Sequence, residues 1–294
     1  MWILLVLMLA DWTAVERLVA RGDYRAAQSE LARLPKDSAR WYVLSSKIAD
    51  GLNDPGAAVS AAEAALQLEP RNESAHVQLG SIFLSRNTPD AALEVFTEAQ
   101  VLLPQSLLIR LGRGLALKEL QRWDDAEAEL THCLPNLLAF DALATTLMQR
   151  GRLADAAVLA QKFIKAAPQD YRGWYFAAAA KEAFDEPGFE VDVRRSIALG
   201  PQFAASRALL GKWLLKHDRV TEAAVELEQA IRWRPDLVQA HLQLAQAYRR
   251  LGRTSDAARE FNIVSDLKEK EKAPRQRLLF HRGASGLNFG GNRN

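Results

Sequence analysis

Five histidines and a single cysteine are the residues of this chain whose chemistry could support catalysis or metal binding. His76 and His241 fall at the same place in two copies of a repeating pattern, so we expect them to lie far apart and to pack separately. His132 and Cys133 are adjacent, and on a helix their side chains would point about 100° apart. A reactive thiol needs an activating base beside it, and the sequence shows none near Cys133. We therefore expect packing residues here, with no metal site and no catalytic residue.

The sequence also lacks the short motifs that carry common enzymatic chemistry. It holds no Gly-x-Gly-x-x-Gly, no phosphate-loop lysine motif and no Gly-x-Ser-x-Gly elbow. One cysteine cannot form an internal disulfide or a paired Cys-x-x-Cys zinc site. We predict that the chain is not an enzyme and that it uses no cofactor.

Composition and charge indicate a folded helical protein and argue against a nucleic-acid partner. Of 294 residues, 49% are hydrophobic and 25% are charged, and alanine and leucine, both strong helix formers, are prominent. The formal charge is +2, but residues 268–294 alone carry seven Lys/Arg against two Glu, a local +5. The other residues carry 31 Lys/Arg and 34 Asp/Glu, a net −3. A slightly acidic body does not fit a nucleic-acid groove.

An unbroken apolar run from Trp2 to Ala10 leaves two interpretations of the cellular location open. Nine residues cannot span a bilayer as a helix, but they are enough for the apolar part of a signal peptide. No Lys or Arg precedes Arg17, and Met8-Leu9-Ala10 is a poor cleavage site. The protein is therefore exported or membrane-tethered, or it is cytoplasmic and residues 1–10 pack as the first helix. We expect membrane association only through residues 1–10.

A pattern of large and small apolar residues returns about every 34 residues. The fullest copy reads His76-x2-Leu79-Gly80-x2-Phe83, then Ala92-x3-Phe96-x2-Ala99-x4-Pro104, and other copies start at Arg207 and His241. Spacings of three and four residues place each set on one helical face. Small residues mark where two helices cross closely, and the proline ends the second helix. The period predicts a stack of helix pairs with a binding groove rather than a globule with a catalytic cleft.

The pattern resembles the tetratricopeptide repeat, whose signature is Trp-x2-Leu-Gly-x2-Tyr, then Ala-x3-Phe, then Pro. The resemblance implies an all-α fold, a right-handed α-solenoid of about seven to eight helix-turn-helix repeats. It covers residues 11–271, with repeats near 8–38, 39–72, 73–106, 107–136, 137–170, 171–203, 204–237 and 238–271. Residues 1–10 form the apolar segment, and residues 272–294 form a basic tail that we expect to be disordered.

Residues that tolerate a left-handed backbone stand between the two helices of many copies. Gly22, Gly151 and Gly252 each follow a predicted first helix, where glycine closes the helix end without strain. Asn87 and Asp218 take the same position in other copies. These residues predict the turns within the repeats.

Three copies break the period. Prolines arrive early at Pro35 and Pro135, and one copy has lost a residue near the unusual turn Asp185-Glu186-Pro187-Gly188. Such breaks alter how repeats stack, so we expect a groove that is not one regular spiral, with specificity in the degenerate middle copies.

In the tetratricopeptide family the groove is lined mainly by the first helix of each repeat, at its second, fifth, ninth and twelfth positions. Carried onto this chain, the resemblance implies a partner-binding groove formed by Val77, Ser81, Leu84, Leu108, Leu111, Leu115, Asp141, Thr145, Met148, Arg172, Tyr175, Glu182, Lys212, Gln246 and Arg249, with Leu215 and Gln239 beside them. Its centre is apolar and its C-terminal half is polar and partly basic, which suits an extended or helical peptide with apolar anchors. The alternative for Leu108, Leu111 and Leu115 is packing against neighbouring repeats.

These observations favour a non-enzymatic scaffold or adaptor that binds a peptide or partner segment of another protein. An exported or membrane-tethered bacterial assembly factor and a regulatory subunit of an enzyme complex stay open as alternatives. Trp213 and Trp233 stand outside the repeating pattern. We expect both to be exposed, where a tryptophan can anchor a partner.

Overall fold

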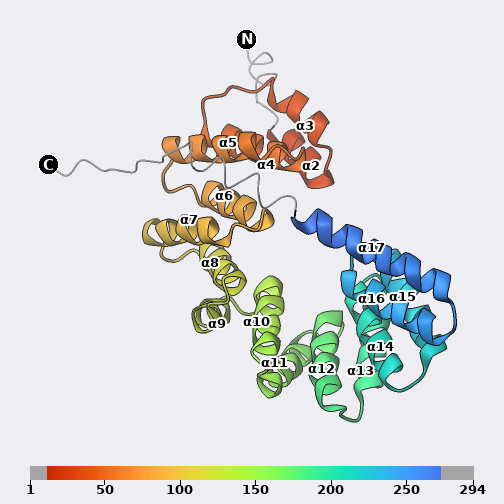
Figure 1. Cartoon of the computed structure of the whole chain (residues 1–294). Coiled ribbons are helices and arrows are strands. Elements are labelled where there is room, and N and C mark those ends of the chain that lie inside the picture. The colour runs from red at the N-terminus through yellow and green to blue at the C-terminus, as the bar shows by residue number, and fades with distance from the viewer. Residues whose placement is uncertain (1–11, 273–294) are drawn as a thin grey trace. The chain divides into compact units, whose positions relative to one another are not determined.

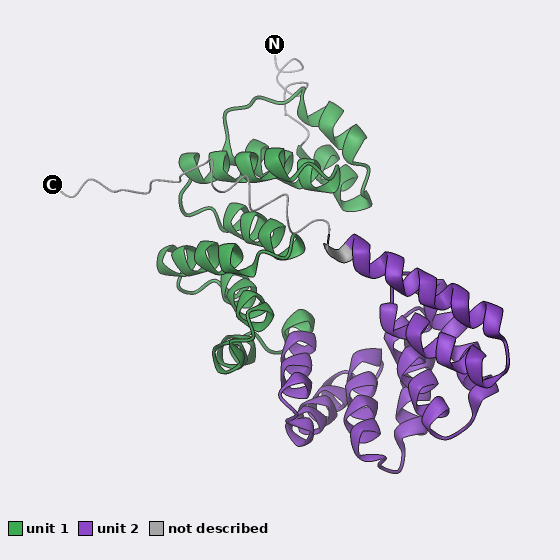
Figure 2. Ribbon diagram, viewed as in Figure 1, with its two compact units in different colours: residues 1–139, 277–294 green, residues 140–276 purple. Residues whose placement is uncertain are grey.

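The computed structural model of the chain describes residues 12–272. The described residues divide into two compact units, unit 1 up to residue 139 and unit 2 from residue 140 onward (Figure 2). Every regular element within residues 12–272 is a helix, and no strand occurs among them. The expectations for the apolar residues 1–10 and for the tail beyond Lys272 lie outside the described residues.

Unit 1 is built from helix pairs in which each helix packs against the next one along the chain (Figure 1). Its helices are α2 (Trp12–Arg21), α3 (Tyr24–Leu31), α4 (Ala39–Gly51), α5 (Pro55–Leu68), α6 (Glu73–Ser85), α7 (Pro89–Leu102), α8 (Leu107–Glu119) and α9 (Trp123–His132). First helices of neighbouring pairs also touch, α4 with α6 and α6 with α8. The pair α2–α3 is the half-visible first copy of the sequence pattern.

Unit 2 continues the same arrangement. Its helices are α10 (Leu137–Gln149), whose first turn belongs to unit 1, α11 (Leu153–Ala166), α12 (Tyr171–Phe184), α13 (Phe189–Leu199), α14 (Ala204–Lys216), α15 (Val220–Trp233), α16 (Val238–Arg250) and α17 (Thr254–Lys272). Stacked rings of Phe140 and Phe163 join α10 to α11, and the later helices each pack on the next. The predicted all-α fold of helix-turn-helix repeats is confirmed.

The second helices of the broken copies are short. Helices α5, α7, α11 and α15 each have 14 residues, whereas α3 has 8, α9 has 10 and α13 has 11. The short helices are those of the copies with an early proline or a lost residue, because proline cannot continue a helix.

Small residues lie where helices approach most closely, as the pattern predicts. The ring of Phe96 on α7 inserts against Gly80 of α6 and Gly112 of α8. A Cβ atom built on either glycine would lie 2.3 Å from Cζ of Phe96, well inside van der Waals contact. Glycine therefore allows one aromatic ring to pack two first helices together.

The turns within repeats have the left-handed backbone that the sequence predicts. Gly22, Gly151 and Gly252 have φ angles of 78°, 71° and 75°, and Asn87 and Asp218 have φ angles of 57° and 61°. Glycine adopts this conformation freely, and asparagine and aspartate tolerate it better than other residues.

The residue at the family's tryptophan position binds the end of the preceding helix pair. Nε2 of His76, Nε1 of Trp174 and Nε2 of His241 each donate a hydrogen bond to the carbonyl of the proline six residues earlier, at 2.9, 3.0 and 2.9 Å. That carbonyl lies beyond a helix end and has no partner within the helix. The packing role predicted for His76 and His241 is confirmed, since both are buried.

Arginines at the ends of first helices reach back to the left-handed turn of the preceding pair. Nη1 of Arg86 donates to Oδ1 of Asn53 at 2.7 Å. Arg250 pairs with Asp218 and donates from Nη1 to the carbonyl of Leu215 at 2.7 Å. A polar side chain at this turn thus links two repeats, which glycine at the same position could not do.

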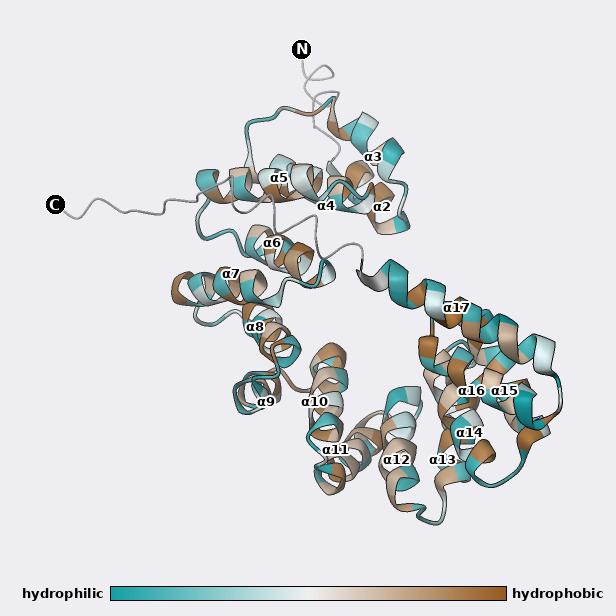
Figure 3. Cartoon of the chain, viewed as in Figure 1, coloured by the Kyte–Doolittle hydropathy of each residue, from teal (hydrophilic) through white to brown (hydrophobic). Residues whose placement is uncertain are grey.

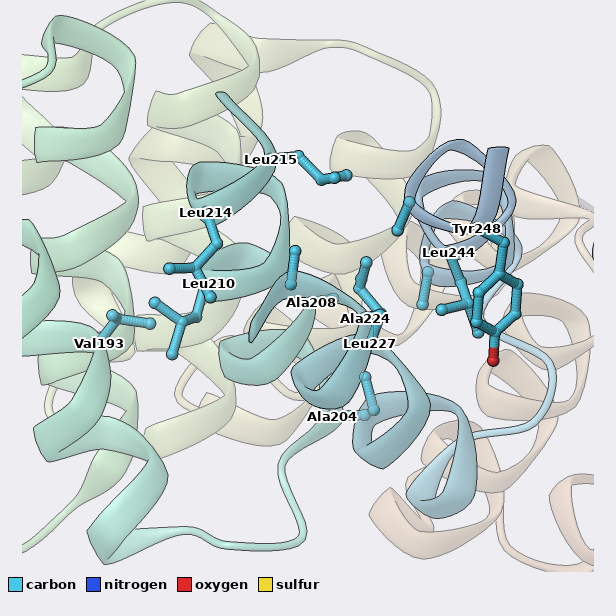
Figure 4. Close-up of a cluster of buried hydrophobic side chains, with 14 of the residues drawn as sticks. Val193, Ala204, Ala208, Leu210, Leu214, Leu215, Ala224, Leu227, Leu244 and Tyr248 are labelled. Carbon is cyan, nitrogen blue, oxygen red and sulfur yellow. The ribbon is translucent and has the colours of Figure 1, made fainter. Parts of the chain in front are cut away.

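The core follows the stack as a series of local clusters. Most helices carry hydrophobic and hydrophilic residues side by side along their length (Figure 3). In unit 2 one such cluster runs from α12 to α17, and its labelled members include Val193, Leu210, Leu227 and Leu244 (Figure 4). Each repeat therefore buries its apolar face against its neighbours, and the polar faces remain for recognition.

Candidate functional site

The polar part of the predicted groove lies on adjacent first helices of unit 2. Asp141, Thr145 and Met148 are partly buried on α10, and Arg172 and Tyr175 are partly buried on α12. The exposed members are Lys212 on α14 with Gln246 and Arg249 on α16. We call these residues, without Glu182, the first-helix face of unit 2.

An ion pair between Asp141 and Arg172 joins α10 to α12 within this face. Nε of Arg172 lies 3.3 Å from Oδ2 of Asp141, and Nη1 of Arg172 lies 2.9 Å from Oδ2 of Asp170. One guanidinium therefore serves two carboxylates. Burial raises the pKa of Asp141 to about 6, against the opposing effect of Arg172. Oδ1 of Asp141 is buried without a hydrogen-bond donor among the described residues.

Tyr175 forms an aromatic wall beside this carboxylate. Its ring meets Phe176 and Phe203 edge-on, with centroids 5.0 and 5.2 Å apart. Burial raises the pKa of Tyr175, while the nearby Arg234 lowers it and Asp141 raises it further. Tyr175 thus lies close enough to Asp141 and Arg234 for their charges to affect its hydroxyl group.

Glu182 links α12 to α14, and it is not part of the first-helix face of unit 2. It is buried, and its Oε2 accepts a hydrogen bond from Nζ of Lys212 at 2.8 Å. The placement of Glu182 as a groove residue is therefore corrected, because its carboxylate is used inside the unit. Lys212 is half exposed and can still meet a partner.

The apolar residues of the predicted groove lie in unit 1 and differ in exposure. Leu108 is 49% exposed and Ser81 is exposed, whereas Leu111 is only 6% exposed. Val77, Leu84 and Leu115 are partly buried. The groove assignment of Leu111 is corrected, since its side chain packs in the core of the unit, which is the alternative stated for it.

Of the two tryptophans outside the pattern, only Trp233 is exposed as expected. Its exposed fraction is 46%. Trp213 is partly buried and stacks on Phe189 and His217, with ring centroids 5.1 and 3.9 Å apart. The expectation for Trp213 is wrong, because those rings cover its indole.

Two members of the site were missed from the sequence. Asp170 caps the start of α12 by accepting from the backbone N–H of Arg172 at 2.9 Å, and it also pairs with the Arg172 side chain. An aspartate directly before a predicted helix is a signal that could have found it. Arg234, in the segment after α15, approaches Tyr175 through folding alone, and no local pattern indicates that proximity.

Within the described residues, no group of three or more histidine, cysteine, aspartate or glutamate residues could hold a metal ion. Cys133 is buried, as expected of a core residue, and burial raises the pKa of its thiol. None of the helices between residues 12 and 272 is long and apolar enough to cross a membrane.

Family models described as "Tetratricopeptide repeat" match residues 45–106 and 214–279. The chain is a tetratricopeptide repeat protein. A search of curated proteins gave no match. Solved structures similar to this tetratricopeptide repeat protein include one of a tetratricopeptide repeat protein from Parabacteroides merdae, with 17% identity and a TM-score of 0.67 over 80% of this chain and 96% of that chain.

Two further solved structures share the fold. The APC/C hetero-tetramer Cut9-Hcn1 has 14% identity and a TM-score of 0.62, over 79% of this chain and 48% of that chain. The pilF protein of Pseudomonas aeruginosa has 18% identity and a TM-score of 0.55, over 69% of this chain and 94% of that chain. At these identities the similarity of each to this tetratricopeptide repeat protein shows the fold alone.

Proposed function

We propose that this chain is a non-enzymatic scaffold whose first-helix face of unit 2 binds a peptide segment of a partner protein. Tetratricopeptide repeats support a protein-interaction scaffold in general. The observation that carries the finer proposal is the buried Oδ1 of Asp141, which lacks a donor beside Arg172 and Tyr175.

The chemistry of this face defines the kind of segment that fits it. A backbone or side-chain N–H of the partner would donate to Oδ1 of Asp141, and an apolar side chain would pack on the ring of Tyr175. Lys212 and Arg249 would attract an acidic group along the same segment. A peptide can present all three in one short stretch.

Affinity capture from the native cell, followed by substitutions on this face, tests the proposal. Tyr175→Ala removes the aromatic wall and Lys212→Glu reverses the exposed charge, and each should reduce the recovered partner about tenfold. Gln67→Ala on α5 of unit 1 is the matched control and should capture as the unchanged chain does. Unchanged recovery with both variants of unit 2, with their melting temperatures intact, would exclude this face as the binding site.

Neither of the two alternatives conflicts with partner binding at this face. The exported or membrane-tethered assembly factor depends on residues 1–10, which lie outside the described residues. The regulatory subunit of an enzyme complex is compatible with the same face, since its activity would belong to the partner.

A further inference from the structure

Three consecutive second helices of unit 2 expose a valine at equivalent positions. Val158 on α11, Val191 on α13 and Val225 on α15 are 55%, 71% and 53% exposed. Each stands two residues after the buried residue that packs its helix on the first helix. The same position in the other pairs is polar or alanine: Ser29, Ser60, Glu94, Ala128 and Arg259. Among the described second helices, an exposed valine at this position is thus confined to three adjacent repeats.

Lysines and arginines follow these valines on the same side of the helices. Lys162 and Lys165 on α11, Arg195 on α13 and Arg232 on α15 lie four or seven residues after a valine, a spacing that shares one helical face. All four are exposed, and none makes an ion pair or hydrogen bond with the described residues. The equivalent positions of α5, α7, α9 and α17 hold no lysine or arginine.

The carboxylates on these three helices do not neutralise the four cations, because each is already bound. On α11 and α13, Asp155 pairs with Arg152, Glu190 with Arg194 and Arg219, and Asp192 with Lys181. On α15, Glu222 pairs with Arg219, Glu226 with Arg207, and Glu228 accepts from the Tyr248 hydroxyl. The side of the helices that carries the valines therefore keeps an uncompensated positive charge.

We propose that this surface is a second interaction site, which binds an acidic amphipathic segment of a partner protein. We call it the valine face: Val158, Val191 and Val225 with Lys162, Lys165, Arg195 and Arg232. Apolar side chains of the segment cover the valines, and its aspartates and glutamates pair with the cations. It lies on second helices, so it is separate from the first-helix face and does not depend on the function proposed for that face.

The relative lengths of the side chains favour a protein segment over an anionic membrane. Valine is short, while lysine and arginine extend well beyond it. A flat lipid surface would meet the charged ends before it reached the valines, whereas a helix or strand is narrow enough to lie between them. Membrane-surface helices also use longer apolar side chains, such as Leu, Phe and Trp.

Selection from a random library of displayed peptides on the full-length chain tests the proposal. The quadruple variant Lys162→Glu/Lys165→Glu/Arg195→Glu/Arg232→Glu serves for counter-selection. Peptides that bind only the unchanged chain should carry Asp and Glu between apolar residues. Their affinity should fall more than about tenfold in the quadruple variant and in Val158→Thr/Val191→Thr/Val225→Thr, which keeps the side-chain shape.

Matched controls separate this site from the first-helix face. Tyr175→Ala and Ser60→Glu should leave binding of these peptides unchanged, and melting temperatures should show that every variant is folded. The proposal is overturned if no acidic peptides are enriched, or if the quadruple variant binds them equally. It is also overturned if only phosphatidylserine vesicles, and no peptide, distinguish the unchanged chain from the quadruple variant.

Discussion

The role of a buried polar residue in this protein depends on the hydrogen-bond partners that its neighbours supply. Nδ1 of His241 meets Oε2 of Glu260 at 2.6 Å while its Nε2 donates to a carbonyl. Both ring nitrogens of His241 therefore have a hydrogen-bond partner. His76 occupies the same position in its repeat, yet its Nδ1 is buried without a partner. The two histidines therefore differ in hydrogen bonding because of one residue on the second helix.

Removal of Glu260 should therefore be costly. Glu260→Ala leaves the buried Nδ1 of His241 without its hydrogen-bond partner, and we expect unit 2 to lose about 2–3 kcal/mol of stability. Val95 stands where Glu260 does in the repeat of His76, and Val95→Ala should cost about 1 kcal/mol. Urea unfolding of both variants checks this, and equal losses would contradict a stabilising hydrogen bond between His241 and Glu260.

Asp141 should make stability depend on pH. Its pKa in the folded chain, about 6, lies above the unfolded value of 3.8, so the folded state binds the proton more tightly. The contribution of Asp141 to stability is therefore most favourable below pH 3.8, and it is lost as the pH rises through about 6. Because Asp141 is partly exposed, screening reduces the effect, and Asp141→Asn should gain about 1 kcal/mol at pH 7.

Thermal unfolding at a series of pH values measures this gain. Asp141→Asn should raise the midpoint at neutral pH and have little effect near pH 4, where the carboxyl is already protonated. Asp170→Asn, which changes the other carboxylate at Arg172, is the companion variant. A lower midpoint for Asp141→Asn at pH 7 would contradict an ionised Asp141 that costs stability.

At the scale of the elements, close contact between first helices depends on residues without a side chain. Phe96 lies between Gly80 and Gly112, and this one ring sets the distance of α6 and α8 from α7. The turns provide a second link between repeats. Asn53 and Asp218 adopt the left-handed backbone conformation, and the side chain of each binds an arginine of the next repeat. Packing and turn chemistry together fix how one helix pair meets the next.

Gly112→Ala should destabilise unit 1 although alanine favours helices. The added Cβ would overlap the Phe96 ring, and overpacking of this kind costs about 1–3 kcal/mol. Gly56→Ala on α5 is the matched control, since its nearest neighbour would lie 3.7 Å away. That control should gain about 0.5–1 kcal/mol from helix propensity. Circular dichroism during denaturation measures both, and equal effects would contradict the packing argument.

At the scale of the whole molecule, each helix pair stabilises mainly its neighbours. A solenoid of this kind has local contacts and no single central core. Damage to one unit should therefore stay in that unit. Hydrogen exchange of Gly112→Ala should increase in α6, α7 and α8, while protection of α14, α15 and α16 stays as in the unchanged chain. Loss of protection throughout both units would contradict local coupling.

Much of the fold could be predicted from the sequence because the same local residue pattern recurs in successive repeats. The helix pairs, the glycine turns and the packed histidines all follow from spacing alone. The site was predicted less well, since position within a repeat does not give burial. Leu111 and Glu182 hold groove positions but are buried, and Trp213 is covered by a phenylalanine where other repeats have alanine. The valine face was missed because its residues come from three repeats, and the pattern within one repeat does not indicate them.

The role proposed for the first-helix face depends on Asp141, which is proposed to accept a hydrogen bond from a bound partner segment. The most direct test is the affinity of a captured partner peptide for the full-length chain across neutral and mildly acidic pH. Because the ionised carboxylate is the better acceptor, affinity should fall as the pH drops below about 6, and Asp141→Asn should remove this dependence. An affinity that is independent of pH, or one that depends on pH equally in Asp141→Asn, would contradict the account.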